Sequence, residues 1–124
     1  ILLENVGGGT PSKSNQNYWD GNINWASVKD LSVNKLVLDD TIDKISELGL
    51  GASKLIPKGN IIICVRMGLG KIAIANIDTA INQDLRALIF SDYIYKKYFI
   101  YFYKTLKFEG QGLTVKGITL DTIN

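Results

Sequence analysis

The chain has 124 residues, of which 46% are apolar and 21% are charged, and its formal net charge at pH 7 is +2. This length is enough for one domain with a single modest core. The sequence has no histidine and one cysteine. These counts exclude an intramolecular disulfide and remove most general-base, catalytic-triad and zinc-site chemistry.

Membrane and export segments are not predicted. No run of about eighteen apolar residues occurs, so no transmembrane helix is expected. Residues 1–6 lack the basic region and cleavage pattern of a signal peptide. We therefore expect a cytoplasmic protein, for which a single unpaired cysteine is suitable.

The N-terminal part is predicted to contain a strand, a long loop and a second strand. Residues 2–5 fit a short strand, and residues 23–28 alternate loosely between apolar and polar side chains. Between them, residues 7–22 are rich in Gly, Ser and Asn and predict an ordered loop. Tyr18 and Trp19 lie in this loop and are expected to pack it onto the core.

The next segment predicts a helix followed by a turn. The helix is expected over residues 42–49, with Asp40 or Thr41 as its cap and Gly49 as its end. Residues 55–59 contain a proline and a glycine and predict a turn.

A β-hairpin is predicted in the middle of the chain. Residues 61–65 form a continuous apolar run, which is typical of a strand buried on both faces. Residues 71–77 predict its partner strand. The loop between them contains Gly68 and Gly70, which can adopt the positive φ that a tight hairpin requires.

The C-terminal part predicts a third strand at residues 86–90 and a helix at residues 92–107. Tyr, Phe and Ile favour strands, but at 100° per residue the lysines gather in one arc of about 100° and most aromatic residues lie opposite. These lysines are Lys96, Lys97, Lys104 and Lys107. Residues from 110 onward predict a loop with a short strand or turn.

These elements predict the α+β class, with a mixed or antiparallel sheet, two packed helices and long loops in a single domain. Motifs for catalysis are incomplete in this sequence. Residues 7–14 approach a phosphate-binding P-loop but place serine where the motif needs its second glycine. The proline pairs of amino-methyltransferases and the Pro-Asp pair of a common nuclease class are absent, because Pro11 precedes serine and Pro57 precedes lysine.

The remaining reactive residues have structural explanations. Asp39 and Asp40 suit the start of a helix better than a metal site. Cys64 lies inside an apolar run and is interpreted as a core thiol. We therefore expect no catalytic residue, no metal and no cofactor.

Basic residues are grouped along the chain. No acid occurs between Glu47 and Asp78 or between Asp92 and Glu109, and each interval contains four basic residues. Such grouping can present one basic face to a polyanion despite the small net charge. A scatter of solvated charges has the same composition, so both interpretations stay open.

The predicted hairpin tip is a candidate anion site. Arg66 and Lys71 bracket the loop, and like charges facing each other across a hairpin end repel. A bound phosphate would relieve this repulsion and approach the backbone N–H groups of Gly68 and Gly70. A solvated loop remains the alternative here, as it does for the lysine arc of the 92–107 helix.

Three residues beyond the hairpin have side chains of the types that can read base edges in the major groove. Asn82 and Gln83 can pair bidentately with adenine, and Arg86 with guanine. Asn and Gln are also common in ordinary loops, so this grouping alone is not specific.

The order of several segments resembles the target recognition domain of type I restriction-modification specificity subunits. Their order and spacing over residues 8–90 carry the resemblance, and beyond residue 90 only the general character matches. The segments are Gly8-Gly9-Thr10-Pro11-Ser12, Tyr18-Trp19, Ile23 to Leu31, Ile45 to Leu50, Ile56-Pro57-Lys58-Gly59, Arg66 to Ala73 and Asn82-Gln83.

The resemblance implies sequence-specific binding of double-stranded DNA, with this domain reading one half of a split target. Family members carry two such domains separated by long helices. A modification subunit supplies methyl transfer, and a restriction or motor subunit supplies ATP-driven cleavage. Residues 1–124 are accordingly expected to be one recognition domain excised from a longer two-domain subunit, without catalysis of its own.

The residues that this reading assigns to DNA lie in the predicted recognition loops. They are Lys29, Arg66, Gly68, Gly70, Lys71, Asn82, Gln83 and Arg86. Two alternatives stay open: the recognition domain of a fused restriction-methyltransferase, and a protein-interaction domain that docks through the aromatic 92–107 helix.

Overall fold

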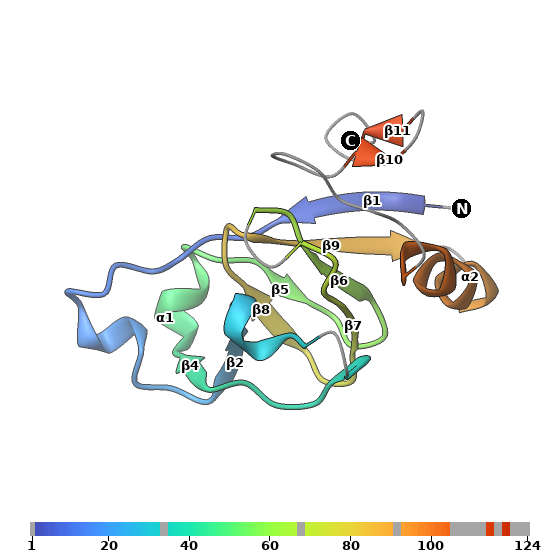
Figure 1. Cartoon of the computed structure of the whole chain (residues 1–124). Helices are drawn as coiled ribbons and strands as arrows, with labels where there is room; N and C mark the ends of the chain where they lie inside the picture. Colours follow the sequence, from blue (N-terminus) through green and yellow to red (C-terminus); the bar gives the residue numbers. More distant parts are fainter. Residues whose placement is uncertain are drawn as a thin grey trace.

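The computed structural model describes residues 2–32, 35–66, 69–90, 93–104, 114–115 and 118–119. Figure 1 shows their arrangement as two sheets and a C-terminal helix. The strands are β1 (Leu2–Gly7), β2 (Ile23–Ala26), β3 (Val37–Leu38), β4 (Asp43–Ile45), β5 (Leu55–Ile56), β6 (Ile61–Cys64), β7 (Ile72–Ala75), β8 (Thr79–Ile81), β9 (Leu85–Phe90), β10 (Thr114–Val115) and β11 (Ile118–Thr119). The helices are η1 (Gln16–Tyr18), η2 (Val28–Asp30), α1 (Glu47–Leu50) and α2 (Tyr93–Lys104).

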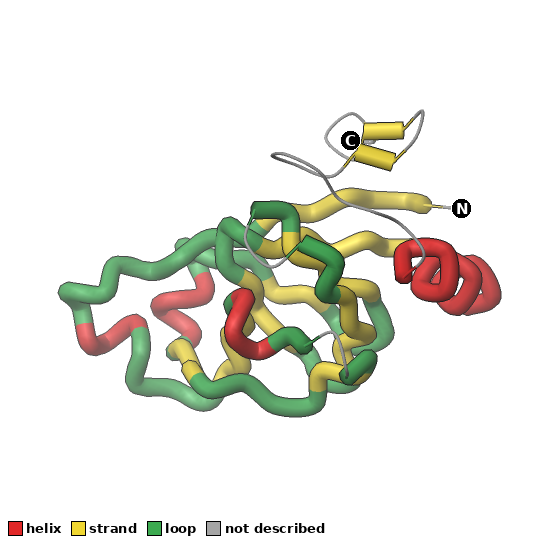
Figure 2. Tube along the Cα trace, viewed as in Figure 1, coloured by secondary structure: helices red, strands yellow, loops and turns green. Residues whose placement is uncertain are grey.

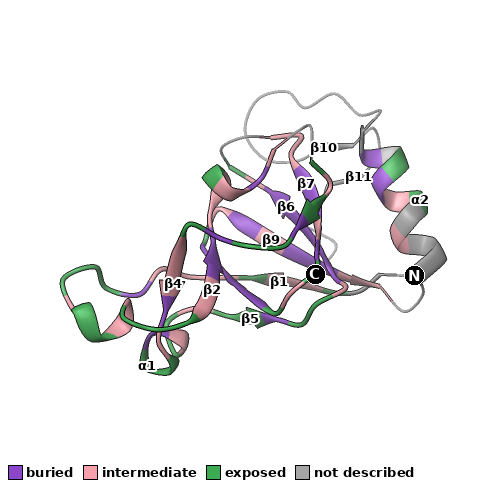
Figure 3. Ribbon diagram, turned by 90° about the horizontal axis from the view of Figure 1, so that it is seen from below, coloured by how far each residue is buried: buried purple, intermediate pink, exposed green. Residues whose placement is uncertain are grey.

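The larger sheet has five strands in the order β1-β9-β6-β7-β3. All neighbours are antiparallel except β3 and β7, which are parallel. The predicted strand at residues 61–65 is the central strand β6, and all four of its residues are buried (Figure 3). The predicted hairpin of β6 and β7 is confirmed, with Ile62 opposite Ala73.

The smaller sheet has four strands in the order β4-β2-β8-β5. β2 and β8 run parallel, whereas β4 and β5 pair antiparallel on the two sides. With two helices packed on mixed sheets, the predicted fold class is confirmed. A separate antiparallel pair of strands, β10 and β11, lies in the C-terminal part.

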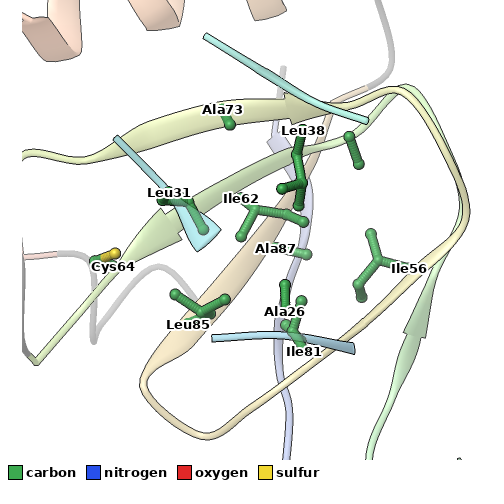
Figure 4. Close-up of a cluster of buried hydrophobic side chains, with 11 residues drawn as sticks. Ala26, Leu31, Leu38, Ile56, Ile62, Cys64, Ala73, Ile81, Leu85 and Ala87 are labelled. Carbon is green, nitrogen blue, oxygen red and sulfur yellow. The ribbon is translucent and has the colours of Figure 1, made fainter. Parts of the chain in front are cut away.

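The main core contains side chains from both sheets. Ile62 and Ala87 come from the larger sheet and pack with Ala26 and Ile81 of the smaller one (Figure 4). Alternate residues of β6 face the other way, where Ile61 and Ile63 join the cluster that α2 covers. This alternation explains why β6 reads as an unbroken apolar run.

The long loop between β1 and β2 is interrupted by one short helical turn, η1 (Figure 2). It is anchored by Trp19, whose ring meets Trp25 edge to face at a centroid distance of 4.9 Å. Trp19 also packs on the third cluster, which includes Ile45 and Ala80. The predicted role of Trp19 in fixing this loop is confirmed.

The helix predicted over residues 42–49 is wrong in its first half. Asp43–Ile45 is strand β4, and the helix is the short α1, whose cap is Ser46 with its hydroxyl accepting from the Gly49 N–H at 3.2 Å. The expected cap Thr41 instead binds strand backbone, accepting from Trp25 N at 3.2 Å and donating to Asp43 O at 2.8 Å. Pairing with β2 therefore overrides the local helix preference of this segment.

Helix α2 is confirmed over Tyr93–Lys104, and the remainder of the predicted 92–107 helix lies outside the described residues. Its buried face packs on the cluster formed by Ile61, Ile63 and Ile72. Ile100 and Tyr103 are buried, whereas Tyr98 and Tyr101 are 74% and 77% exposed. In the described part of the chain, no helix has the length and apolar character needed to cross a bilayer.

Candidate nucleic-acid interface

Three connecting segments meet at one end of the larger sheet. They are residues 8–10 after β1, residues 65–66 and 69–71 between β6 and β7, and residues 82–84 between β8 and β9. Val65 N donates to Asp84 O at 2.9 Å, and Gly9 N donates to Ile81 O at 3.0 Å. We call these three segments the loop end.

The glycines at residues 8 and 9 allow the first segment to lie against neighbouring backbone. A Cβ added to Gly8 would lie 2.1 Å from Ile81 O, and one added to Gly9 would lie 2.3 Å from Ala52 O. Real Cβ atoms cannot approach so closely, because such contacts are far inside van der Waals distance. The partial likeness to a P-loop therefore has a packing cause.

The expected repulsion between Arg66 and Lys71 is wrong. Lys71 lies opposite Cys64, whose N–H donates to Lys71 O at 3.3 Å, so the two cations do not face each other. Arg66 instead lies 3.7 Å from Asp84 in a pair whose arginine side chain is 66% exposed. Gly70 has the predicted positive φ, at +98°, and Gly68 lies outside the described residues.

The turn before β9 is fixed by Asn82. This residue is buried, its N–H donates to Ala26 O at 3.1 Å, and its Oδ1 accepts from Asp84 N at 3.0 Å. The side-chain oxygen thus supports the turn. Gln83 is exposed, and its Oε1 accepts a hydrogen bond from the Thr10 hydroxyl.

Arg86 lies just inside the sheet, opposite Gly7 on β1 and Ile63 on β6. Its Nη1 donates to Asn5 Oδ1 at 3.0 Å. The guanidinium passes beside Gly7, 3.7 Å from where a Cβ would lie, so the glycine leaves room for it.

Lys29 is on η2 and its ammonium pairs with Asp43 at 2.7 Å. The hydrogen bond that Lys29 donates to Asp43 is the largest cause that raises the pKa of Lys29, although desolvation opposes it. The charge of Lys29 is therefore largely compensated within the protein.

Charge is distributed unevenly over the described residues. The acids Asp39 and Asp40 pair with Lys35 and Lys44 at the i,i+4 spacing. The loop end and the first residues of β9 carry Arg66, Lys71 and Arg86 against one acid, Asp84. No group of three His, Cys, Asp or Glu residues that could hold a metal occurs in the described ranges.

Two features of this arrangement were not predicted from sequence. Thr10 belongs to the Gly8–Ser12 segment of the family resemblance, but its pairing with Gln83 depends on contact between residues 73 positions apart. Lys54 also lies beside the loop end, because its carbonyl accepts from Ile81 N at 3.3 Å. Both placements follow from sheet topology rather than from local pattern.

The fold and the loop end together define a recognition domain: rigid sheets that hold exposed polar side chains on loops. Residues 2–124 match the model of the family described as the type I restriction modification DNA specificity domain. The chain belongs to this family.

Curated relatives agree with the family model. The chain is 32% identical over 108 residues to the type I restriction enzyme MjaIX specificity subunit of Methanocaldococcus jannaschii, which covers 82% of this chain and 24% of the relative. It is 37% identical over 99 residues to the EcoR124I/EcoR124II specificity subunit of Escherichia coli, covering 74% of this chain and 24% of that subunit. The chain thus spans about a quarter of the length of these relatives.

Two solved structures have a similar fold. A chain from a study of complex assembly and conformational transition of the type I R-M system matches with a TM-score of 0.62 at 21% identity, over 82% of this chain and 25% of that one. The HsdS subunit from Thermoanaerobacter tengcongensis matches with a TM-score of 0.54 at 18% identity, over 81% of this chain and 25% of that one.

Proposed function

We propose that this domain recognises one half of a split double-stranded DNA target and thereby directs the methylation and restriction performed by partner subunits. The observation that carries the proposal is membership of a DNA specificity family together with a loop end that carries Arg66 and Lys71 against one acid and exposes Gln83. The proposed partners are duplex DNA, a modification subunit and a restriction or motor subunit. The domain itself has no catalytic role in this proposal, and it acts in the cytoplasm.

Phosphate contacts are assigned to the cations of the loop end. The ion pair of Arg66 with Asp84 is long, at 3.7 Å, and exposed. It therefore contributes little to stability and leaves most N–H donors of the Arg66 guanidinium available to a phosphate. Lys71 makes no ion pair within the described residues. The backbone N–H groups of Gly70, which precedes Lys71, and of Gly68 are assigned to the same phosphate contact.

Base reading is assigned to the segment that enters β9. Gln83 is exposed and suits direct contact, whereas Asn82 shapes the turn and Arg86 supports the start of the strand. Lys29 follows the end of β2, whose Ala26 O accepts from Asn82 N. Phosphate contacts would fix the register and the base contacts would supply sequence information.

Residues 1–124 form one recognition domain of a longer two-domain subunit in this proposal. The chain covers 24% of each of two specificity subunits, which supports a second reading domain elsewhere in the whole protein. A single half-site domain binds weakly, because joining two sites multiplies their effective affinity. The relatives favour a separate specificity subunit over a fused restriction-methyltransferase.

Charge reversal tests this assignment in the assembled complex. Arg66→Glu with Lys71→Glu removes about two phosphate contacts, so the slope of log affinity against log salt should fall by about two. Lys58→Glu is the matched control, since Lys58 precedes the opposite end of β6. Equal slopes for the double variant and the control would contradict the assignment.

A second candidate function is docking of a protein partner on α2. The observation that favours it is the exposure of Tyr98 and Tyr101, at 74% and 77%. Replacing both tyrosines with serine should then lower the mass of the complex formed with the modification subunit. An unchanged mass would leave DNA recognition as the sole function.

A further inference from the structure

We propose that Gln83 reads an adenine in the major groove and that Thr10 is its positioning residue. This inference rests on the proposed function. It adds to that function the base that is read and the hydrogen bond that orients the Gln83 side chain. It depends on three features of the loop end: a fixed backbone around Gln83, a fixed backbone around Thr10, and the hydrogen bond between their side chains.

The backbone on both sides of Gln83 is held by hydrogen bonds. Asn82 N donates to Ala26 O at 3.1 Å, and Asp84 N donates to Asn82 Oδ1 at 3.0 Å. Asp84 O accepts from Val65 N at 2.9 Å. Gln83 therefore projects an exposed side chain from a turn whose neighbours are tied to β2 and to the β6–β7 connection. Such support is what a precise contact requires.

Thr10 is held in place by the residues before it. Gly9 N donates to Ile81 O at 3.0 Å, and Gly9 O accepts from the Trp25 indole N–H at 3.1 Å. Pro11, which follows, is buried. The close approach that Gly8 and Gly9 permit brings the Thr10 hydroxyl within reach of the turn after β8.

The side-chain hydrogen bond fixes the orientation of the Gln83 amide. The Thr10 hydroxyl donates to Oε1, and the amide makes no other hydrogen bond within the described residues. An amide oxygen has two lone pairs, so one lone pair of Oε1 and both Nε2–H donors remain available to a ligand. One acceptor beside one donor complements adenine, which offers the N6 amino group and the N7 acceptor in the major groove.

A stabilising role does not explain this contact. Holding a long polar side chain at the surface costs rotamer freedom, and exposed polar pairs return little in stability. Binding gains from the same arrangement, because the side chain is ordered before DNA arrives. Guanine presents two acceptors at the same edge, so an amide whose oxygen faces the base would reject it.

The test uses the whole specificity subunit assembled with its modification subunit. Its target is first mapped by sequencing of methylated DNA, and affinities are then measured for duplexes with each base pair of this half-site substituted in turn. We expect one A·T pair at which Gln83→Ala loses roughly 5- to 150-fold of discrimination. Gln16→Ala is the matched control, because Gln16 is an exposed glutamine on η1 outside the loop end.

Thr10 is tested by a pair of variants that differ in the hydroxyl. Thr10→Val removes the donor at nearly constant shape and should relax discrimination at the same base pair only. Thr10→Ser retains the hydroxyl and should preserve it. A structural role would instead lower the affinity for every duplex equally, or the thermal midpoint, for Thr10→Val.

Three results would overturn the inference. If Gln83→Ala leaves discrimination at every base pair unchanged, Gln83 does not read a base. If Gln83→Ala changes discrimination at a G·C pair instead, the base is not adenine. Wild-type behaviour of Thr10→Val beside a relaxed Gln83→Ala would remove the positioning role. Failure of the proposed function is distinct, since then exchanging the entire domain would change no position of the target.

Discussion

Cys64 and Tyr103 are two weak acids held in the core. Cys64 is 0% and Tyr103 is 1% exposed. Burial raises the pKa of the Cys64 thiol from 9.0 to about 11, and burial also raises the pKa of the Tyr103 hydroxyl. Both groups therefore stay uncharged in the folded chain at pH values where the unfolded chain releases their protons.

The protein should lose stability as the pH rises above about 9. The folded state retains protons that the unfolded state gives up, so unfolding becomes more favourable between the unfolded and folded pKa values. For Cys64 the loss at pH 10 is about 1.4 kcal/mol, because pH 10 lies one unit above the unfolded pKa and one unit below the folded pKa. Urea unfolding at pH 7 and at pH 10 measures this loss. The free energy of unfolding should differ less between the two pH values in Cys64→Ala than in the wild-type protein. Equal differences in both proteins would contradict the assignment.

At the scale of elements, the end of β1 is joined to β8 by direct backbone contact. Gly8 lies so close to Ile81 that any Cβ would overlap the carbonyl oxygen, at 2.1 Å. The same approach places residues 8–10 in the loop end. Gly51 at the end of α1 differs, because its nearest neighbour would be Leu48 O at 3.7 Å.

Gly8→Ala should therefore destabilise the fold, whereas Gly51→Ala should be tolerated. Overpacking of a close contact costs about 1–3 kcal/mol, and the free energy of unfolding from urea titration measures it. The Gly51 variant controls for the general effect of replacing glycine on the unfolded chain. Similar stabilities of the two variants would show that β1 does not dock on β8 in this way.

Elements with a strong local pattern could be predicted from the sequence. The apolar run of β6 and the helical period of α2 are properties of the residues themselves. The two- and three-residue strands β3, β5 and β8 were missed, because so short a strand is specified by its partner in the sheet rather than by its own sequence. The segment of β4 was taken for a helix for the same reason.

In the candidate site too, features that depend on local sequence could be predicted, whereas features that depend on the fold could not. Gly70 was identified because its turn needs a positive φ, and that requirement is local. The relation of Arg66 to Lys71 depends on strand register, and the contact of Thr10 with Gln83 depends on how β1 meets β8. The residues of the loop end could therefore be predicted from the sequence, whereas their contacts depend on the fold.

At the scale of the whole molecule, two sheets share one core, and α2 packs through Ile100 and Tyr103 on the other side of the larger sheet. Acidic residues Asp39, Asp40 and Asp43 are each paired with a lysine. The loop end is left with more cations than acids. A small net charge of +2 thus coexists with an excess of cations at the loop end.

The proposal that this domain reads one half of a split DNA target is tested most directly by a domain exchange. In a complete specificity subunit, this domain is replaced with another domain of its family. The subunit is assembled with its modification partner, and methylated sites are mapped across a genome by single-molecule sequencing. If this domain reads one half-site, one half of the split target changes with the exchange and the other half is retained. A target that is unchanged in both halves, in a complex that assembles and methylates normally, would contradict the proposal.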